Sequence, residues 1–95
     1  MYVVVRSYSG QSATELFDLL EQRQPEIKEL ISGVPGFVSY AAFRSGDDAG
    51  MTVTTCEEKA GTDESSRRAA EWVAENVTTA GDPPVITEGS TFLQF

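Results

Sequence analysis

Hydrophobic positions recur along the chain in two patterns, which predict alternating strands and helices. Runs rich in Val, Tyr, Phe and Thr predict four strands, at 2–8, 37–44, 51–56 and 85–95. Between them, apolar residues at three- and four-residue spacing predict two helical stretches, which end near Gly33 and before Gly81. The order strand, helix, strand, strand, helix, strand indicates a ferredoxin-like βαββαβ α+β fold. We expect one domain over residues 1–95, with four antiparallel strands and both helical stretches on one face.

Local signals predict where the first helical stretch begins, breaks and ends. Ser12 and Glu15 match a capping box, in which each side chain satisfies a free backbone N–H at a helix start. Pro25 lies inside the stretch, so we expect a kink near Gln24, or two shorter helices with Pro25 opening the second. Gly33 suits a left-handed C-cap, because it has no Cβ.

The second helical stretch is predicted to have one apolar and one charged face. We expect Thr62 or Asp63 to cap its N-terminus. Its inner stripe comprises five residues: Ala69, Ala70, Trp72, Val73 and Val77. Its outer face carries two oppositely charged pairs at four-residue spacing, Glu64 with Arg68 and Arg67 with Glu71.

Both faces of the predicted sheet are apolar. Apolar residues stand next to each other in Val3–Val5, Tyr40–Phe43 and Val85–Ile86, where a sheet with one face in water would alternate. The helices can cover only one face, and a bare apolar face would exceed the patch size usual for a monomer. We therefore expect a second copy to pack sheet to sheet as a homodimer. The apolar end of the chain, residues 92–95, is positioned to reach across to that partner.

Composition and charge narrow the classes of function. With 7 Lys and Arg against 15 Asp and Glu, the formal net charge is −8, which disfavours binding to nucleic acid or to an anionic membrane. No run approaches the length of a membrane span, and Met1–Arg6 is too short for a signal-peptide core, so we expect a cytoplasmic protein. The single cysteine and the absence of histidine argue against an internal disulfide, a thiol-based zinc site and a metal cofactor.

The chain resembles the antibiotic biosynthesis monooxygenase type of dimeric α/β barrel over nearly its whole length. The resemblance rests on the Val-rich opening strand, on segment 33–40, on the acidic hairpin 46–48 and on segment 56–58. The second helix, at 64–73, is similar to that of a poorly characterised bacterial branch of this superfamily. The resemblance implies a dimeric barrel built from two ferredoxin-like protomers.

The same resemblance implies two kinds of chemistry. Members of known activity include oxygenases that oxidise aromatic polyketide-like substrates without metal or flavin, and enzymes that degrade haem. The haem-degrading branch uses an Asn on the first strand with a Trp and a His on the second helix. Here only Trp72 corresponds, and Arg6, Ser7 and Tyr8 stand where the Asn would lie, so haem degradation is excluded. The cofactor-free oxygenases use Trp, Tyr and Asn near the pocket, and here Asn76 falls one turn after Trp72 rather than before it.

Three aromatic residues are candidates for a binding site. Trp72 lies on an inner helical face, where it is either core packing or a wall of a pocket for an aromatic molecule. Tyr8 and Tyr40 lie on neighbouring parts of the predicted sheet and offer phenol hydroxyls to a ligand carbonyl, or else to solvent or backbone.

Two arginines stand in otherwise apolar strands. Arg6 and Arg44 each need a carboxylate or a bound anion, and either is a weak candidate for ligand binding. Glu57 and Glu88 are the available partners, so we expect structural ion pairs. If Glu57 is not held in such a pair, it is the best candidate for a general base.

Three hypotheses of function follow. The first is a homodimeric domain that binds a small hydrophobic or aromatic molecule without metal or haem. The second is a cofactor-independent monooxygenase acting on an aromatic substrate, in a pocket lined by Tyr8, Tyr40 and Trp72. The third is a structural or regulatory dimer with a filled interior and no ligand. The volume of the interior pocket separates the third hypothesis from the other two.

Overall fold

The computed structural model describes residues 1–95 and has the predicted ferredoxin-like α+β fold. Its strands are β1 (Tyr2–Ser9), β2 (Phe37–Gly46), β3 (Ala49–Cys56) and β4 (Val85–Ser90). Its helices are α1 (Gln11–Gln22), α2 (Gln24–Ser32) and α3 (Lys59–Asn76). All neighbouring strands are antiparallel, in the order β2-β3-β1-β4. The prediction of fold class from the order of elements is confirmed.

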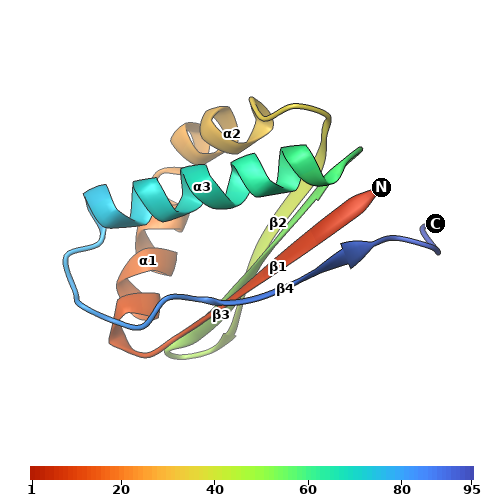
Figure 1. The fold of residues 1–95 in the computed structure, drawn as a ribbon. Helices are drawn as coiled ribbons and strands as arrows, with labels where there is room; N and C mark the ends of the chain where they lie inside the picture. The colour runs from red at the N-terminus through yellow and green to blue at the C-terminus, as the bar shows by residue number, and fades with distance from the viewer.

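The helices and the sheet form two layers. Figure 1 shows α1, α2 and α3 on one side of the sheet and no segment of the chain over the other side. Strand β4 ends at Ser90, so the prediction that it runs to Phe95 is wrong. Strand β1 begins at Tyr2, which pairs with Ser90, and the pairing ends with a hydrogen bond from the backbone N–H of Thr91 to the carbonyl oxygen of Met1, at 2.9 Å. The side chains of the terminal segment are exposed, Phe92 to 92%.

Pro25 divides the first helical stretch into two helices, which confirms one of the two alternatives. Pro25 lies in the first turn of α2, where its missing N–H breaks no helical hydrogen bond. The capping box is wrong, because α1 begins after Gly10 and no side chain caps it. The carboxylate of Glu15 instead accepts hydrogen bonds from the backbone N–H groups of Thr78, at 2.9 Å, and Thr79, at 2.7 Å. These bonds lower the pKa of Glu15 to about 2.

The C-terminal end of α2 also differs from the prediction. Gly33 has an ordinary right-handed conformation, with φ of −80°. The left-handed glycine is Gly36, with φ of 65°, which turns the chain into β2. Arg68 of α3 lies against Gly33 and donates a hydrogen bond to the carbonyl oxygen of Leu30, at 2.9 Å. A side chain from another helix therefore satisfies a carbonyl that a left-handed cap would have satisfied.

Helix α3 begins at Lys59, so the predicted caps Thr62 and Asp63 are wrong. The hydroxyl of Thr62 donates to the carbonyl oxygen of Lys59, and Asp63 pairs with the ammonium group of Lys59 at 2.9 Å. Small residues let this half of α3 approach the sheet. A Cβ on Gly61 would lie 2.8 Å from the Cβ of Cys56, at the end of β3, and 2.1 Å from the carbonyl oxygen of Pro35, in the turn before β2.

The two charged pairs predicted for the outer face of α3 are confirmed. Arg68 contacts Glu64 at 3.0 Å, and Arg67 contacts Glu71 at 2.6 Å. On the inner face, Trp72 is buried as predicted, whereas Ala70 is exposed. Val73 and Val77 are half-buried and pack against the core as predicted, and the inner face extends further into the N-terminal half of α3, where Thr62 and Ser65 are buried.

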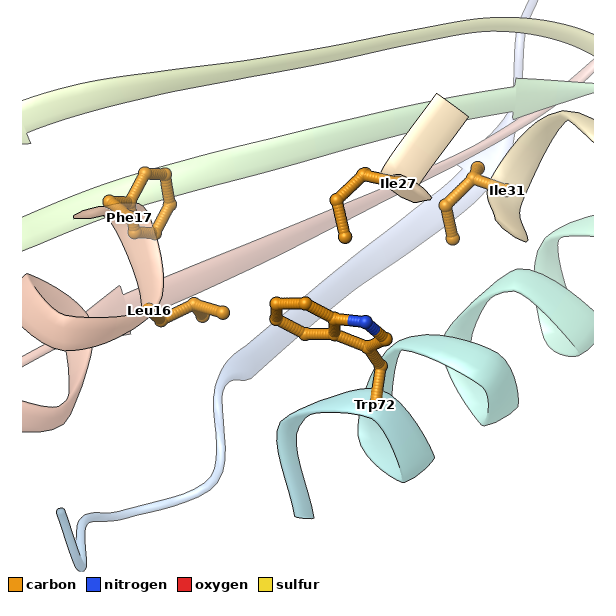
Figure 2. Close-up of a cluster of buried hydrophobic side chains, with 5 residues drawn as sticks. All are labelled: Leu16, Phe17, Ile27, Ile31 and Trp72. Atoms are coloured by element: carbon orange, nitrogen blue, oxygen red, sulfur yellow. The ribbon is translucent and has the colours of Figure 1, made fainter. Parts of the chain in front are cut away.

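The hydrophobic core lies between the three helices and one end of the sheet. Figure 2 shows Trp72 of α3 pointing between Leu16 of α1 and Ile27 of α2. Phe17 and Ile31 complete this cluster of buried side chains. Burial of side chains of this size is the main stabilising contribution that this small domain has.

Gly50 of β3 gives a test of how closely α1 packs on the sheet. A Cβ at this position would lie 2.5 Å from the ring of Phe17. We expect Gly50→Ala to lower the free energy of unfolding by about 1 to 3 kcal/mol, because the ring must move. At Gly46, at the other side of the same hairpin, a Cβ would lie 3.8 Å from its nearest neighbour. Urea unfolding of Gly46→Ala should show a change of no more than about 0.5 kcal/mol, and equal losses in both variants would contradict this packing.

Candidate functional site

An open cleft lies between the helices α1 and α2 and the edge strand β2. Its volume is about 620 Å³. Its apolar and aromatic walls include Phe17, Leu20, Ile27, Ile31, Phe37 and Tyr40. Three charged residues also line it: Glu21, Lys28 and Arg44. A mainly apolar cleft of this volume with a few polar groups is typical of a site for a small hydrophobic molecule.

A second, much smaller cavity adjoins the cleft inside the protomer. Four residues line both spaces and form the partition between them: Leu20, Ile27, Ile31 and Tyr40. The remaining wall of this inner cavity includes Tyr8, Thr52 and Trp72. Its volume is about 20 Å³. This is room for about one atom the size of a water oxygen.

Arg6 is buried next to the inner cavity without a carboxylate partner. Only 2% of its surface is exposed. Its guanidinium group donates hydrogen bonds to four hydroxyl oxygens: Thr52 at 3.1 Å, Thr54 at 3.2 Å, Ser65 at 2.6 Å and Ser66 at 3.3 Å. The predicted ion pair of Arg6 with Glu57 or Glu88 is therefore wrong. The acceptors are neutral and come from β3 and α3, which Arg6 joins.

The phenols near Arg6 are held in their neutral form. Burial raises the pKa of Tyr8, and it raises the pKa of Tyr40 to about 12. The positive charge of Arg6 acts on both phenols in the opposite direction, and a hydrogen bond with Thr52 also lowers the pKa of Tyr40. Burial likewise lowers the pKa of Arg6, but a guanidinium group stays protonated at neutral pH. The interior thus combines one cation with two neutral hydroxyl donors.

Arg44 forms the kind of ion pair that was predicted, with different partners. It contacts Asp18 at 2.8 Å and Glu21 at 3.0 Å, both on α1. These contacts join the edge strand β2 to α1 at the cleft. Because the pairs are partly exposed, they contribute little to stability.

Trp72 presents its ring to the inner cavity and its N–H to a carboxylate. The indole N–H donates to Glu26 at 2.6 Å, and the guanidinium of Arg23 lies 5.9 Å from the ring centre. Arg23 in turn donates to Asn76 at 2.7 Å. Trp72 is thus a core side chain beside Leu16 and Ile27 (Figure 2) and also a wall of the cavity. Its hydrogen bond to Glu26 fixes the orientation of the ring.

The predicted carboxylates lie away from the interior. Glu57 is exposed, lines neither space, and donates its backbone N–H to the carbonyl oxygen of Gly36 at 2.8 Å. Glu88 contacts Lys59 at 3.3 Å. The one carboxylate that lines the cleft is Glu21, which is paired with Arg44. The polar groups of the cleft are therefore the paired Glu21 and Arg44, the ammonium group of Lys28, one amide and several hydroxyls, and neither space has an unpaired carboxylate.

Sequence reasoning missed the hydroxyl residues around Arg6. Thr52 and Thr54 lie on the same face of β3, two residues apart, and this alternation was visible in the sequence. The predicted caps Thr62 and Asp63 lie four and five residues after the observed N-cap, Glu58, so the prediction put Ser65 and Ser66 in the first turn of the helix rather than against the sheet.

No group of three or more histidine, cysteine, aspartate or glutamate side chains is arranged to hold a metal ion. No helix combines the length and apolar character that crossing a membrane requires.

Comparisons with known proteins give matches at the level of structure. No family model and no curated protein matches the sequence. A protein of unknown function from Nitrosomonas europaea superimposes with a TM-score of 0.75 at 18% identity, over 99% of this chain and 91% of the other. The monooxygenase from the gene ActVA-Orf6 of Streptomyces coelicolor, solved with nanaomycin D, superimposes with a TM-score of 0.67 at 20% identity. The match covers 99% of this chain and 89% of the other. SnoaB of Streptomyces nogalater, a cofactor-independent oxygenase, superimposes with a TM-score of 0.60 at 16% identity. The match covers 99% of this chain and 94% of the other.

The bond between Trp72 and Glu26 gives a test of how the cavity wall is held. We expect Glu26→Ala to lower the free energy of unfolding by about 1 kcal/mol, since the buried indole loses its acceptor, and to alter the fluorescence of the single tryptophan. Glu29→Ala is the control, because Glu29 is exposed on the same helix and makes no side-chain hydrogen bond. Identical spectra and stabilities for the two variants would show that Glu26 does not hold the indole.

Proposed function

Because the chain has the fold of the antibiotic biosynthesis monooxygenase-like proteins, we propose that it forms a homodimer and binds a small hydrophobic or aromatic molecule in each protomer. The binding needs neither metal nor haem. The observation that carries this proposal is the 620 Å³ cleft between α1, α2 and β2. A structural dimer that binds no ligand would be expected to have a filled interior instead of a cleft of this size.

The chemistry of the cleft supports an aromatic ligand. Phe17, Phe37 and Tyr40 offer ring faces and edges, against which an aromatic molecule packs favourably. Tyr40 lines both the cleft and the inner cavity, so its hydroxyl is available to orient a ligand oxygen. Apolar walls supply affinity, and the few hydroxyls supply orientation.

The bare face of the sheet supports a homodimer. The strand residues that face away from the helices include Val3, Val5, Ala41, Phe43, Val53 and Val85. Phe43 is 48% exposed and Val85 is 69% exposed, and they lie on the two edge strands. A second copy packed on this face would bury an apolar surface that the chain has no segment to cover. The exposed apolar residues 92–95 extend beyond β4 and would be buried in the same assembly.

The dimer would also affect the cleft. Phe43 belongs to the bare face and also lines the cleft, because β2 is an edge strand. A partner that covers Phe43 would narrow the opening of the cleft and exclude water from it.

Cofactor-independent oxygenation of an aromatic substrate is the second candidate. The observation in its favour is that Tyr8, Tyr40 and Trp72 surround an inner cavity with room for a single oxygen atom. Binding is placed first, because Glu57 lies outside both spaces and Glu21 is paired with Arg44. Consumption of oxygen by the protein with a bound hydroxylated aromatic would favour the second candidate.

Charge on the bare sheet face tests the dimer. Ala41 is exposed in the protomer, so we expect Ala41→Glu to fold and to convert the dimer to monomer, because the interface would bury an unpaired carboxylate. Native mass spectrometry reports the subunit count and any retained small molecule together. Ala74→Glu, on the exposed side of α3, should remain dimeric. A monomeric wild-type protein would refute the proposed assembly.

Filling the cleft tests ligand binding. Ala42 is exposed and lines the cleft, so the indole of Ala42→Trp would occupy the space of the ligand. We expect equilibrium dialysis with 7-methoxycoumarin, a small uncharged aromatic, to show an affinity at least about tenfold weaker than that of the wild type. Ala74→Trp carries the same added ring outside the cleft and should bind like the wild type. Equal affinities in all three proteins would place the bound molecule elsewhere.

A further inference from the structure

The bare face of the sheet has larger apolar side chains at one end than at the other. At that end, the strand register places Phe43, Met51 and Val85 in one row, with a serine of β1 between the last two. At the other end, the corresponding row has Ser39 on β2 and Gly89 on β4. The exposed side chains of Phe43 and Val85 thus lie in the same row, on the two edge strands.

Two orientations of a two-fold axis pack this face on its own copy with aligned strands. Sheets packed face to face keep their strands within about 30° of each other, so the axis between them runs either along the strands or across them. An axis along the strands places β2 over the partner's β4 and keeps the rows together, so Phe43 meets the partner's Val85. An axis across the strands inverts the rows and places Phe43 over the partner's Ser39 and Val85 over the partner's Gly89. Because the first orientation buries apolar side chains against each other, the register favours the axis along the strands.

This axis determines where the partner's β4 ends. Ser90 pairs with Tyr2, Tyr2 with Cys56, and Cys56 with Phe37, so one row joins the end of β4 to the start of β2. The rotation therefore brings the partner's Ser90 to the level of Phe37. The apolar segment 92–95, which follows β4, leaves the partner's sheet at that level.

The length of segment 92–95 decides which copy it can reach. The backbone N–H of Thr91 donates to the carbonyl oxygen of Met1 at 2.9 Å, so the free part of the chain begins at Phe92. Four extended residues span about 13 Å, which exceeds the separation of about 10 Å between packed sheets. Strand β2 of the same protomer is the opposite edge of the sheet, three strand spacings or about 14 Å from β4. The segment can therefore reach the partner's β2 but not that of its own protomer.

The cleft ends at the same place. Ile31 and Ser32, in the last turn of α2, and Phe37, the first residue of β2, line this end of it. Figure 1 shows segment 92–95 extending beyond β4 and clear of the three helices, and its apolar side chains are exposed in the protomer. An apolar segment without a contact in its own protomer thus lies opposite an apolar opening in the partner.

We infer that segment 92–95 of one copy packs against the start of the partner's β2 and closes the end of the partner's cleft. The inference rests on the proposed function, since it adds a wall to that cleft. Each cleft is then built from two chains, and the apolar side chains of the segment exclude water from the bound molecule. The site is incomplete in a monomer.

Opposite charges on the two edge strands test the axis. Phe43→Lys and Val85→Glu each bury an unpaired charge in the interface, so native mass spectrometry should find each single variant monomeric. The variant that carries both substitutions should be dimeric again, because the introduced charges of the two copies meet. The two positions lie on opposite edges of one sheet, so the charges cannot pair within a protomer. A double variant that stays monomeric, while the wild type is dimeric, overturns the inference.

Polar substitutions in the segment test its contact with the cleft. A triple variant carries Phe92→Ser, Leu93→Ser and Phe95→Ser, and it should fold because all three side chains are exposed in the protomer. We expect equilibrium dialysis to show that it binds 7-methoxycoumarin about tenfold more weakly than the wild type. If the triple variant is monomeric, Leu93→Ser alone takes its place in the experiments below.

Mixed dimers, refolded together and isolated through two different affinity tags, show which cleft a segment closes. In the first, one chain carries Ala42→Trp, which fills its cleft, and the other chain carries the triple substitution. The open cleft then meets the unchanged segment of the other chain and should bind as tightly as the wild type, with one molecule per dimer. In the second, one chain carries all four substitutions and the other chain none. Its open cleft meets the altered segment and should bind about tenfold more weakly.

The outcomes separate this inference from the proposed function. Weak binding in the first mixed dimer and tight binding in the second would mean that the segment acts on its own protomer, which overturns the inference. Equal affinities of the wild type and the triple variant refute the role of the segment and leave the proposed function in place. A wild type that is monomeric, or that does not bind 7-methoxycoumarin, refutes the proposed function together with the inference.

Discussion

The guanidinium group of Arg6, held between sheet and helix by hydroxyl groups alone, constrains much of the surrounding structure. It requires hydroxyl acceptors on β3, which Thr52 and Thr54 supply, and on α3, which Ser65 and Ser66 supply. The N-terminal half of α3 therefore contacts the sheet through small and polar residues rather than through an apolar stripe. Apolar packing is concentrated instead around Trp72, where α1, α2 and α3 meet (Figure 2). The polar and apolar halves of the interior meet at the inner cavity.

The edge strand β2 connects the two surfaces on which the proposed function depends. Its side chains line the cleft on one face and extend the bare apolar face of the sheet on the other, with Phe43 belonging to both. Arg44 holds this strand to α1 through Asp18 and Glu21. A partner on the bare face and a ligand in the cleft would thus contact the same strand, which couples assembly to binding.

The sequence predicts the elements well because their signals are local. Val-rich runs indicate the strands, and the break at Pro25 follows from the chemistry of one residue. The errors come from side chains whose partners are distant in the sequence. Glu15 binds Thr78 and Thr79 instead of capping its own helix, and Arg68 replaces a glycine cap at the end of α2. Capping signals in the sequence describe a helix in isolation, whereas these contacts form only when the helices pack against one another.

The sequence predicts which aromatic residues line the inner cavity, but it does not predict which charged groups lie close together. Tyr8, Tyr40 and Trp72 do line one inner cavity. Arg6 was expected to pair with a carboxylate, because an isolated sequence shows which charges exist and not which ones are close. A crystal structure of the protein with 7-methoxycoumarin tests the proposed binding site most directly. We expect the ring to lie in the cleft between α1, α2 and β2, against Phe17, Phe37 and Tyr40. A ring bound outside this cleft would contradict the proposal.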